Sequence, residues 1–293
     1  TTTELKDFLD FKAEQYENID FIANDPIKIP HQYQRKEDIE IAAFFIATVA
    51  WGNRLSIIKS GLKMTSIWGD SPYEFIMEYS AKDKPQFVHR TFNSEDFDFF
   101  CRSLQNIYNN GGLEKCFDIK KGETVNAYNR IGNFRERMLS TTHQKRSEKH
   151  ISNPKKNSAC KRIVMFLRWM VRNPKNGVDF GIWKNISPKE LYVPLDVHTG
   201  NIARKLNLIT RKQNDWKTNE ELIGFIRHEN YNTHAKVDDL ILKNDKYNRT
   251  DVTFGIGWKL TKGAMLKFDY QILSNESDDK NTSRINFGTA IWF

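Results

Sequence analysis

The segment Ser158–Arg172, SACKRIVMFLRWMVR, has the clearest helical pattern in the chain. Its apolar residues recur at steps of three and four over 163–170, which places them on one face of a helix. Lys161, Arg168 and Arg172 share the opposite face, because steps of seven and eleven residues are close to whole turns. The segment therefore predicts a helix with one buried face and one basic face.

Helical patterns also fill most of the chain on either side of this segment. Residues with N-cap chemistry precede several of them, namely Ser71 before Pro72, Asn93 or Ser94, Thr124 and Asp196. The stretch 143–157 is polar and basic and predicts a loop or short hairpin. The predicted helices cover 4–22, 36–50, 54–68, a segment from 72, a segment from 94, 124–140, 158–172, 196–206 and 216–228.

The pattern changes after His228, where a polar stretch over 229–250 shows almost no periodicity. Beyond it apolar residues alternate with polar ones over 252–260, 264–272 and 285–293, which is the period of strands with one apolar face. We therefore expect a mainly α protein with a short three-stranded antiparallel β tail. The predicted division is a helical domain over 1–228, a polar linker and a β tail over 251–293.

Composition sets limits on the class of protein. The 293 residues include 39% hydrophobic and 28% charged residues, ordinary values for a globular protein, and the net charge of +8 favours polyanionic partners such as nucleic acid. Three widely separated cysteines do not have metal-ligand spacing and predict reduced thiols. We expect no metal site, no transmembrane helix and no signal peptide, and therefore a cytoplasmic location.

The segment Val193-Pro194-Leu195-Asp196-Val197-His198, followed by Ile202-Ala203-Arg204, resembles the aspartate motif of the helix-hairpin-helix DNA glycosylases, especially their 8-oxoguanine branch. The resemblance implies a helix-hairpin-helix glycosylase-like helical domain with Asp196 as a catalytic residue. It also implies that Lys161, where the lysine-bearing hairpin of that family should lie, is the nucleophile. The Gly-x-Gly that usually precedes this lysine is absent, as it also is in an archaeal branch.

A further resemblance covers nearly all of residues 1–228. The chain is similar to an uncharacterised bacterial family, common in Bacteroidetes, that is a remote relative of these glycosylases. That family has no established activity, and its link to the glycosylases is a remote sequence relationship. The matching stretches are Ala50-Trp51-Gly52-Asn53-Arg54, His89-Arg90-Thr91-Phe92-Asn93, 161–172, 177–181 and 194–208.

These resemblances imply a DNA base-excision glycosylase, possibly also a lyase, that acts on a damaged purine such as 8-oxoguanine in double-stranded DNA without a cofactor. A lysine amine can attack the sugar, and a carboxylate can activate it. The competing structural interpretations are an N-cap for Asp196 and a solvated basic face for Lys161. The expected DNA-binding residues are Asn53, Arg54, Lys155, Lys156, Arg168 and Arg172, although Asn53 could be only a cap and the others only solvated.

Two other functions stay open. The chain could be a non-catalytic nucleic-acid-binding module. It could also be a fragment of an outer-membrane porin-like protein fused to a helical domain, because the tail over 251–293, with its terminal Trp292-Phe293, resembles the last strands of a bacterial outer-membrane β-barrel. The resemblance of the tail to a β-barrel, next to a helical domain of another family, indicates a chimera joined near His228. Association with the outer membrane is expected only if the tail is functional.

Overall fold

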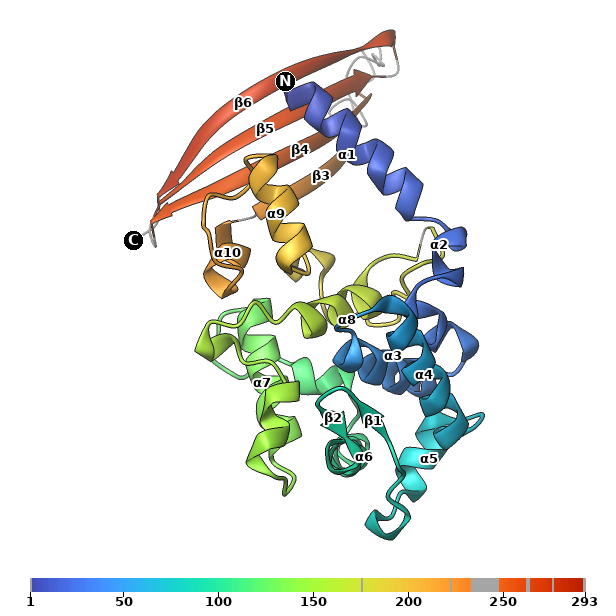
Figure 1. Cartoon of the computed structure of the whole chain (residues 1–293). Helices are drawn as coiled ribbons and strands as arrows, with labels where there is room; N and C mark the ends of the chain where they lie inside the picture. The colour runs from blue at the N-terminus through green and yellow to red at the C-terminus, as the bar shows by residue number, and fades with distance from the viewer. Residues whose placement is uncertain are drawn as a thin grey trace, which may run out of the picture. The chain divides into compact units, whose positions relative to one another are not determined.

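The computed structural model describes residues 2–174, 176–221, 223–232, 248–261, 264–275 and 277–291. The chain is mainly helical, with an antiparallel sheet near its C-terminus (Figure 1). It forms two compact units, one of residues 1–202 and 214–216 and the other of residues 203–213 and 217–293. Within the described part of the chain, none of the helices has the length and apolar character that crossing a bilayer requires.

The core of the first unit is built around helix α3, Lys36–Val49. This helix is buried over residues 38–49, because apolar residues occupy nearly its whole circumference rather than one stripe. The ring of Phe44 contacts three other buried rings, with centroids at 5.4 Å from Phe100, 5.4 Å from Phe134 and 5.6 Å from Phe166. These rings come from three further helices, so one aromatic cluster joins the core.

The other elements follow the expected order along the chain. The helices are α1 Thr2–Tyr16, α2 Ile19–Ala23, α4 Arg54–Trp68, α5 Pro72–Glu78, α6 Ser94–Asn109, α7 Ala127–Leu139, α8 Lys161–Val171, α9 Val197–Lys205 and α10 Trp216–Glu221. Short 3-10 helices are η1 Pro26–Lys28, η2 Pro30–Gln32, η3 Ala81–Asp83, η4 Glu114–Phe117, η5 Lys145–His150, η6 Pro154–Lys156 and η7 Pro188–Glu190. A small hairpin pairs β1, Val88–His89, with β2, Phe92–Asn93.

Two helix starts that depend on local capping were predicted correctly. Ser71 Oγ accepts a hydrogen bond from the Glu74 amide at 3.2 Å, and Pro72 is the first residue of α5. Asn93, rather than Ser94, caps α6 and forms a reciprocal capping box with Asp96. These caps need only residues close in sequence, which is why the sequence revealed them.

Three helix boundaries predicted between residues 4 and 172 were wrong. The helix predicted over 4–22 is divided into α1 and α2, and Asn18 caps the second. Helix α7 begins at Ala127 behind the cap Asn126, not at Thr124. Helix α8 begins at Lys161 rather than Ser158, because Cys160 has a left-handed backbone with φ of 52° that no continuous α-helix can contain.

The sheet of the second unit has strand order β3-β4-β5-β6, with every neighbouring pair antiparallel. The three predicted tail strands are present as β4 Asn248–Thr261, β5 Ala264–Asn275 and β6 Asp278–Ile291. The helix predicted over 216–228 was wrong beyond residue 221. The segment β3, Ile223–Asn232, is instead a fourth strand, in register from Ile223 with Gly257 to Asn232 with Asn248.

The reason for this difference is tertiary. The backbone of β4 offers hydrogen-bond groups along its edge, and pairing with them outweighs the weak helical pattern of the segment. The predicted linker over 229–250 thus contributes its first residues to β3 and its last to β4. Residues 233–247 of that linker, together with Lys262, Gly263, Trp292 and Phe293 of the predicted tail, lie outside the described residues.

Candidate functional site

A cavity of about 480 Å³ in the first unit contains both predicted catalytic residues. Lys161 and Asp196 line it together with Asp25. A volume of this size is within the range of small-ligand sites, which run from about 300 to 1,000 Å³. The remaining lining residues are Ala13, Tyr16, Glu17, Phe21, Met165, Arg168, Trp169, Arg172, Val178, Asp179, Val193, Pro194 and Thr199.

Lys161 and Asp196 face each other across this cavity from two helix starts. Lys161 is the first residue of α8, and its Nζ lies 3.8 Å from Asp196 Oδ2. Asp196 Oδ1 accepts a hydrogen bond from the Thr199 amide at 2.9 Å, so the side chain also caps α9. The predicted capping role is therefore confirmed. It leaves the second carboxylate oxygen directed at the lysine.

The Asp196 carboxyl is held in its anionic form. Burial alone would raise its pKa, but the hydrogen bond from the Thr199 amide and the positive charge of Lys161 outweigh burial and lower the pKa below its ordinary value. An ionised carboxylate beside an amine is suited to orient that amine and to stabilise a positive charge that develops on a ligand.

Asp25, which sequence reasoning missed, is a second carboxyl group on the same cavity. It lies between α2 and η1, and its Oδ1 accepts a hydrogen bond from the Ile27 amide at 3.0 Å. Burial raises its pKa above the ordinary value, although Arg54, Lys161 and Arg168 act against that rise. No local motif marks Asp25, since an aspartate before a proline most often only starts a turn.

Arg168 and Arg172 also line the cavity, but both are already engaged by carboxylates. Arg168 Nε lies 3.3 Å from Asp179 Oδ2 and its Nη2 lies 3.4 Å from Glu17 Oε1. Arg172 forms ion pairs with the same two acids. The shared basic face of Lys161, Arg168 and Arg172 is therefore present, but all three cations form ion pairs with carboxylates of the protein itself.

Asn53 and Arg54 lie at the start of α4. Asn53 Oδ1 accepts hydrogen bonds from the amides of Leu55 at 2.9 Å and Ser56 at 3.3 Å, so its predicted capping role is confirmed. Arg54 is exposed, and its positive charge acts to lower the pKa of Asp25. The structure thus brings Arg54 close to the cavity that holds Lys161 and Asp196.

Lys155 and Lys156 do not line this cavity. They belong to η6, and both are exposed. Lys155 Nζ lies 2.9 Å from Glu136 Oε1, and the other carboxylate oxygen of Glu136 forms an ion pair with Lys120. These two lysines stay predicted DNA-binding residues on a surface outside the pocket.

One comparison with known proteins gives a match. A family model described as protein of unknown function (DUF2400) matches residues 25–243. The chain belongs to this family. No curated protein and no solved structure matches the chain significantly. The DUF2400 match includes Asp25, Lys161 and Asp196, and it continues past His228, where the sequence pattern had suggested the end of the helical domain.

The turn over 51–54, inside the DUF2400 match, is held by two arginines that sequence reasoning did not select as site residues. The guanidinium of Arg162 lies 4.8 Å from the ring centroid of Trp51 and donates a hydrogen bond of 2.5 Å to the carbonyl of Thr48 at the end of α3. Burial lowers the pKa of Arg162 to about 10. The other arginine, Arg90, packs over Gly52 with its Nη1 only 2.6 Å from where a Cβ would be.

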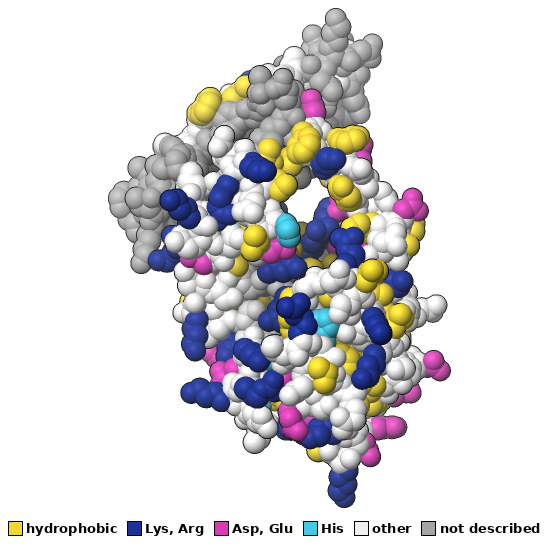
Figure 2. Space-filling model, in the orientation of Figure 1, with side chains coloured by type: hydrophobic (Ala, Val, Ile, Leu, Met, Phe, Trp, Pro, Cys, Tyr) yellow, Lys and Arg dark blue, Asp and Glu magenta, His cyan; other side chains and the backbone are white. Residues whose placement is uncertain are grey.

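These arginines add basic groups around the turn over 51–54. Figure 2 shows dark blue Lys and Arg side chains gathered on one face around the position of α8 in Figure 1. The stretches containing Trp51 and Arg90 both match the bacterial family, so the sequence carried a signal for each of them. What the sequence could not show is that the two stretches meet.

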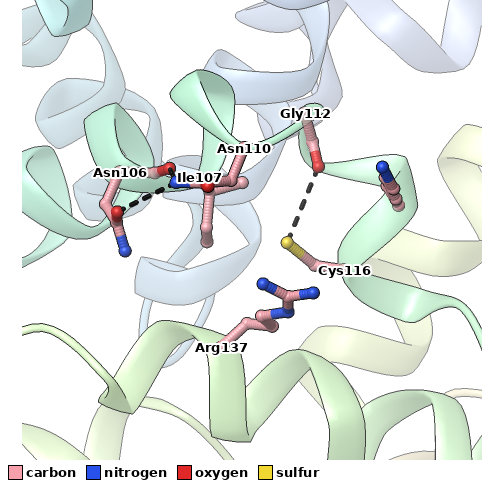
Figure 3. Close-up of a pocket in the computed structure, with 7 residues that line it drawn as sticks. Asn106, Ile107, Asn110, Gly112, Cys116 and Arg137 are labelled. Carbon is pink, nitrogen blue, oxygen red and sulfur yellow. Dashed lines mark hydrogen bonds between the residues drawn. The ribbon is translucent and has the colours of Figure 1, made fainter. Parts of the chain in front are cut away.

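A second cavity lies between the end of α6 and α7 but has room for little more than one water molecule, at about 10 Å³ (Figure 3). Cys116 lies in it, with Sγ 3.6 Å from the Gly112 carbonyl, and burial raises the pKa of this thiol to about 12. A protonated thiol is a poor nucleophile. All three cysteines are free and buried, as expected for reduced thiols.

No group of three or more His, Cys, Asp or Glu side chains is arranged to hold a metal ion in the part of the chain that the structure describes. The large cavity offers the Lys161 amine, the carboxyl groups of Asp25 and Asp196 in different electrostatic environments, two acids paired with arginines, and an apolar wall. Phe21, Met165 and Trp169 form much of that wall.

Proposed function

We propose that this chain is a DNA base-excision glycosylase that acts on a damaged purine such as 8-oxoguanine, with Lys161 as nucleophile and Asp196 as its activating carboxylate. The observation that carries the proposal is the separation of 3.8 Å between Lys161 Nζ and Asp196 Oδ2 inside one cavity. The resemblance of the segments around these two residues to glycosylase motifs supports the same roles.

The proposed reaction begins with a nucleotide rotated out of the duplex into the cavity. The Lys161 ammonium first releases its proton to solvent. Its amine then attacks the sugar carbon that bears the base, the bond from that carbon to the base breaks, and opening of the sugar ring gives a Schiff base. Asp196, which is ionised, orients the amine and stabilises the positive charge that develops on the sugar. Phe21 and Met165 offer apolar surface against which a flipped base can stack.

Basic side chains at the surface would bind the phosphates. The net charge of +8 and the exposed Arg54 beside the cavity favour a polyanionic substrate. The proposed partner is double-stranded DNA that contains a damaged base. No metal or organic cofactor takes part in the proposed step, because the lysine and the carboxylate supply its chemistry.

The test is covalent trapping with the full-length chain. The protein is incubated with duplexes that contain 8-oxoguanine or an abasic site, and sodium borohydride is added to reduce any Schiff base. We expect a trapped complex with the native chain, none with Lys161→Gln, and an undiminished amount with Lys189→Gln, which removes an exposed lysine outside the cavity. Thermal melting followed by circular dichroism confirms that each variant is folded.

Two results would contradict the proposal. Full trapping by Lys161→Gln would exclude this lysine as the nucleophile. DNA binding by a folded native chain that releases no base from any lesion duplex, and forms no trapped complex, would favour a non-catalytic nucleic-acid-binding module.

A further inference from the structure

Asp25 is a carboxyl group on the cavity that belongs neither to the lysine–aspartate pair nor to an arginine ion pair among the described residues. Asp25 reaches it from the segment between α2 and η1, whereas Lys161 and Asp196 come from the starts of α8 and α9. Asp25 Oδ1 accepts the hydrogen bond from the Ile27 amide. Among the described residues no other hydrogen bond to this carboxyl is found, which leaves its second oxygen available to a ligand.

The charged groups around Asp25 are Arg54 from α4 and Lys161 and Arg168 from α8. Three positive charges would normally keep a carboxyl ionised. Burial nevertheless outweighs them and raises the pKa of Asp25. Burial also raises the pKa of Asp179 on the cavity wall. Asp179 and Glu17, however, are both paired with Arg168 and Arg172, whereas Asp25 forms no ion pair among the described residues.

The cavity therefore contains two carboxyl groups with opposite behaviour beside one amine. Asp196 is stabilised as an anion, whereas Asp25 is shifted toward its protonated form. A pair of carboxyl groups whose environments push their pKa values apart is the arrangement by which enzymes divide the roles of anion and proton donor.

We propose that Asp25 is the general acid that protonates the leaving purine, opposite the lysine nucleophile. This inference rests on the proposed glycosylase function and adds a third catalytic residue to it.

The proposed step forms one bond at the sugar and breaks another. Once the Lys161 ammonium has released its proton to solvent, the lone pair of the amine forms a bond to the sugar C1′ as the bond from C1′ to the base nitrogen breaks. The electron pair of the broken bond leaves with the base, and the proton of the Asp25 carboxyl passes to a ring nitrogen of that base. The neutral base departs, Asp25 becomes a carboxylate, and the new ammonium at Lys161 can return a proton to it.

The experiment compares base release with Schiff-base formation in the full-length chain. Asp25→Asn removes the acidic proton but keeps an oxygen that can accept the Ile27 hydrogen bond. The matched control is Asp20→Asn, which removes an exposed carboxylate from α2 outside the cavity. Single-turnover release of 8-oxoguanine from duplex DNA reports on departure of the base. Borohydride trapping on abasic-site DNA, where the base is already gone, reports on the lysine alone.

We expect Asp25→Asn to slow base release by roughly 100-fold, the size of a general-acid contribution, while trapping on abasic DNA stays within about twofold of the native chain. The native rate should fall as pH rises and Asp25 loses its proton, and the variant should lack this limb. Base release within twofold of native, or an equal loss of both activities, would overturn the role of Asp25. A native chain that neither releases base nor forms a trapped complex would instead overturn the glycosylase function itself.

Discussion

At the scale of single residues, the buried carboxyl of Glu40 shows how strongly the core perturbs a side chain. Glu40 is 2% exposed and accepts hydrogen bonds from Trp183 Nε1 at 2.5 Å and from the Tyr108 hydroxyl at 2.8 Å. Burial raises its pKa from 4.5 to about 7 in spite of these donors and of Lys36. Glu40 therefore links α3 to α6 and to the segment after α8. Its ionisation in the core lowers the free energy of unfolding, so this link depends on pH.

This shift predicts a pH dependence of stability. Between pH 4.5, where the unfolded carboxyl ionises, and about 7, where the folded one does, the folded state binds more protons. The free energy of unfolding should therefore fall as pH rises through this window and level off above it, by roughly 3 kcal/mol at about 1.4 kcal/mol per pKa unit. Glu40→Gln, which keeps both hydrogen bonds possible, should remove this change in urea titrations at pH 5 and pH 8. The exposed Glu78→Gln is the control, and an unchanged slope in Glu40→Gln would refute the assignment.

Asp196 yields a prediction that separates activity from stability. Asn at this position can still cap α9 through its side-chain oxygen but provides no negative charge beside Lys161. Since the ion pair is partly exposed, we expect Asp196→Asn to change the free energy of unfolding by less than about 1 kcal/mol. Base release should fall at least about 100-fold, because loss of an electrostatic stabiliser acts on the transition state. A large loss of stability with normal activity per folded molecule would show that Asp196 is only a cap.

At the scale of elements, the approach to α8 decides where Lys161 lies. Asn157 closes η6 with φ of 59°, and Cys160 precedes α8 with φ of 52°. Both values are in the left-handed region that glycine adopts most readily. The sequence lacks the Gly-x-Gly expected before this lysine, but the backbone adopts left-handed conformations at non-glycine residues there.

Asn157 should be the more sensitive of these two positions. It tolerates its backbone conformation better than most residues do, and its Nδ2 donates a hydrogen bond of 2.9 Å to Asp215 Oδ2. Asn157→Ala should lower the free energy of unfolding by about 1–3 kcal/mol through backbone strain and the lost contact. Asn157→Gly, which keeps the conformation accessible, should cost less in the same urea titration. Equal losses in both variants would show that the hydrogen bond, not the backbone conformation, matters.

At the scale of the whole molecule, the cations that make up the net charge include both paired and unpaired side chains. Arg168, Arg172 and Lys155 are paired with carboxylates, whereas no ion pair of Arg54 or Arg90 is found among the described residues. A cation that the protein already neutralises gains less from a phosphate than an unpaired one. DNA binding by the proposed glycosylase should therefore depend more on the unpaired arginines than on the paired ones.

Salt dependence can test this division. Replacing both Arg54 and Arg90 by Gln should make the slope of log K against log salt concentration shallower by about 2, because each phosphate contact contributes about 0.9. The double variant Arg168→Gln and Arg172→Gln should change the slope by less than about 1. Fluorescence anisotropy with a duplex between 50 and 200 mM salt measures both. The opposite order would place the phosphates over α8 instead.

The sequence by itself determined what depends on neighbours along the chain. Periodicity predicted α3, α4 and the strands β4, β5 and β6, and cap chemistry predicted the start of α5. The resemblance to glycosylase motifs singled out Lys161 and Asp196, and the structure brings these two together. Such features succeed because a helix face, a strand face and a cap are each set by residues within a few positions of one another.

Only the tertiary structure decided the features that join distant segments. It made a strand of β3, since an unpaired strand edge outweighs a weak helical pattern. It neutralised Arg168 and Arg172 with Glu17 and Asp179, and it brought Asp25 into the cavity of Lys161. The physical reason is that ion pairing and burial depend on separation in space, and sequence separation does not report that distance.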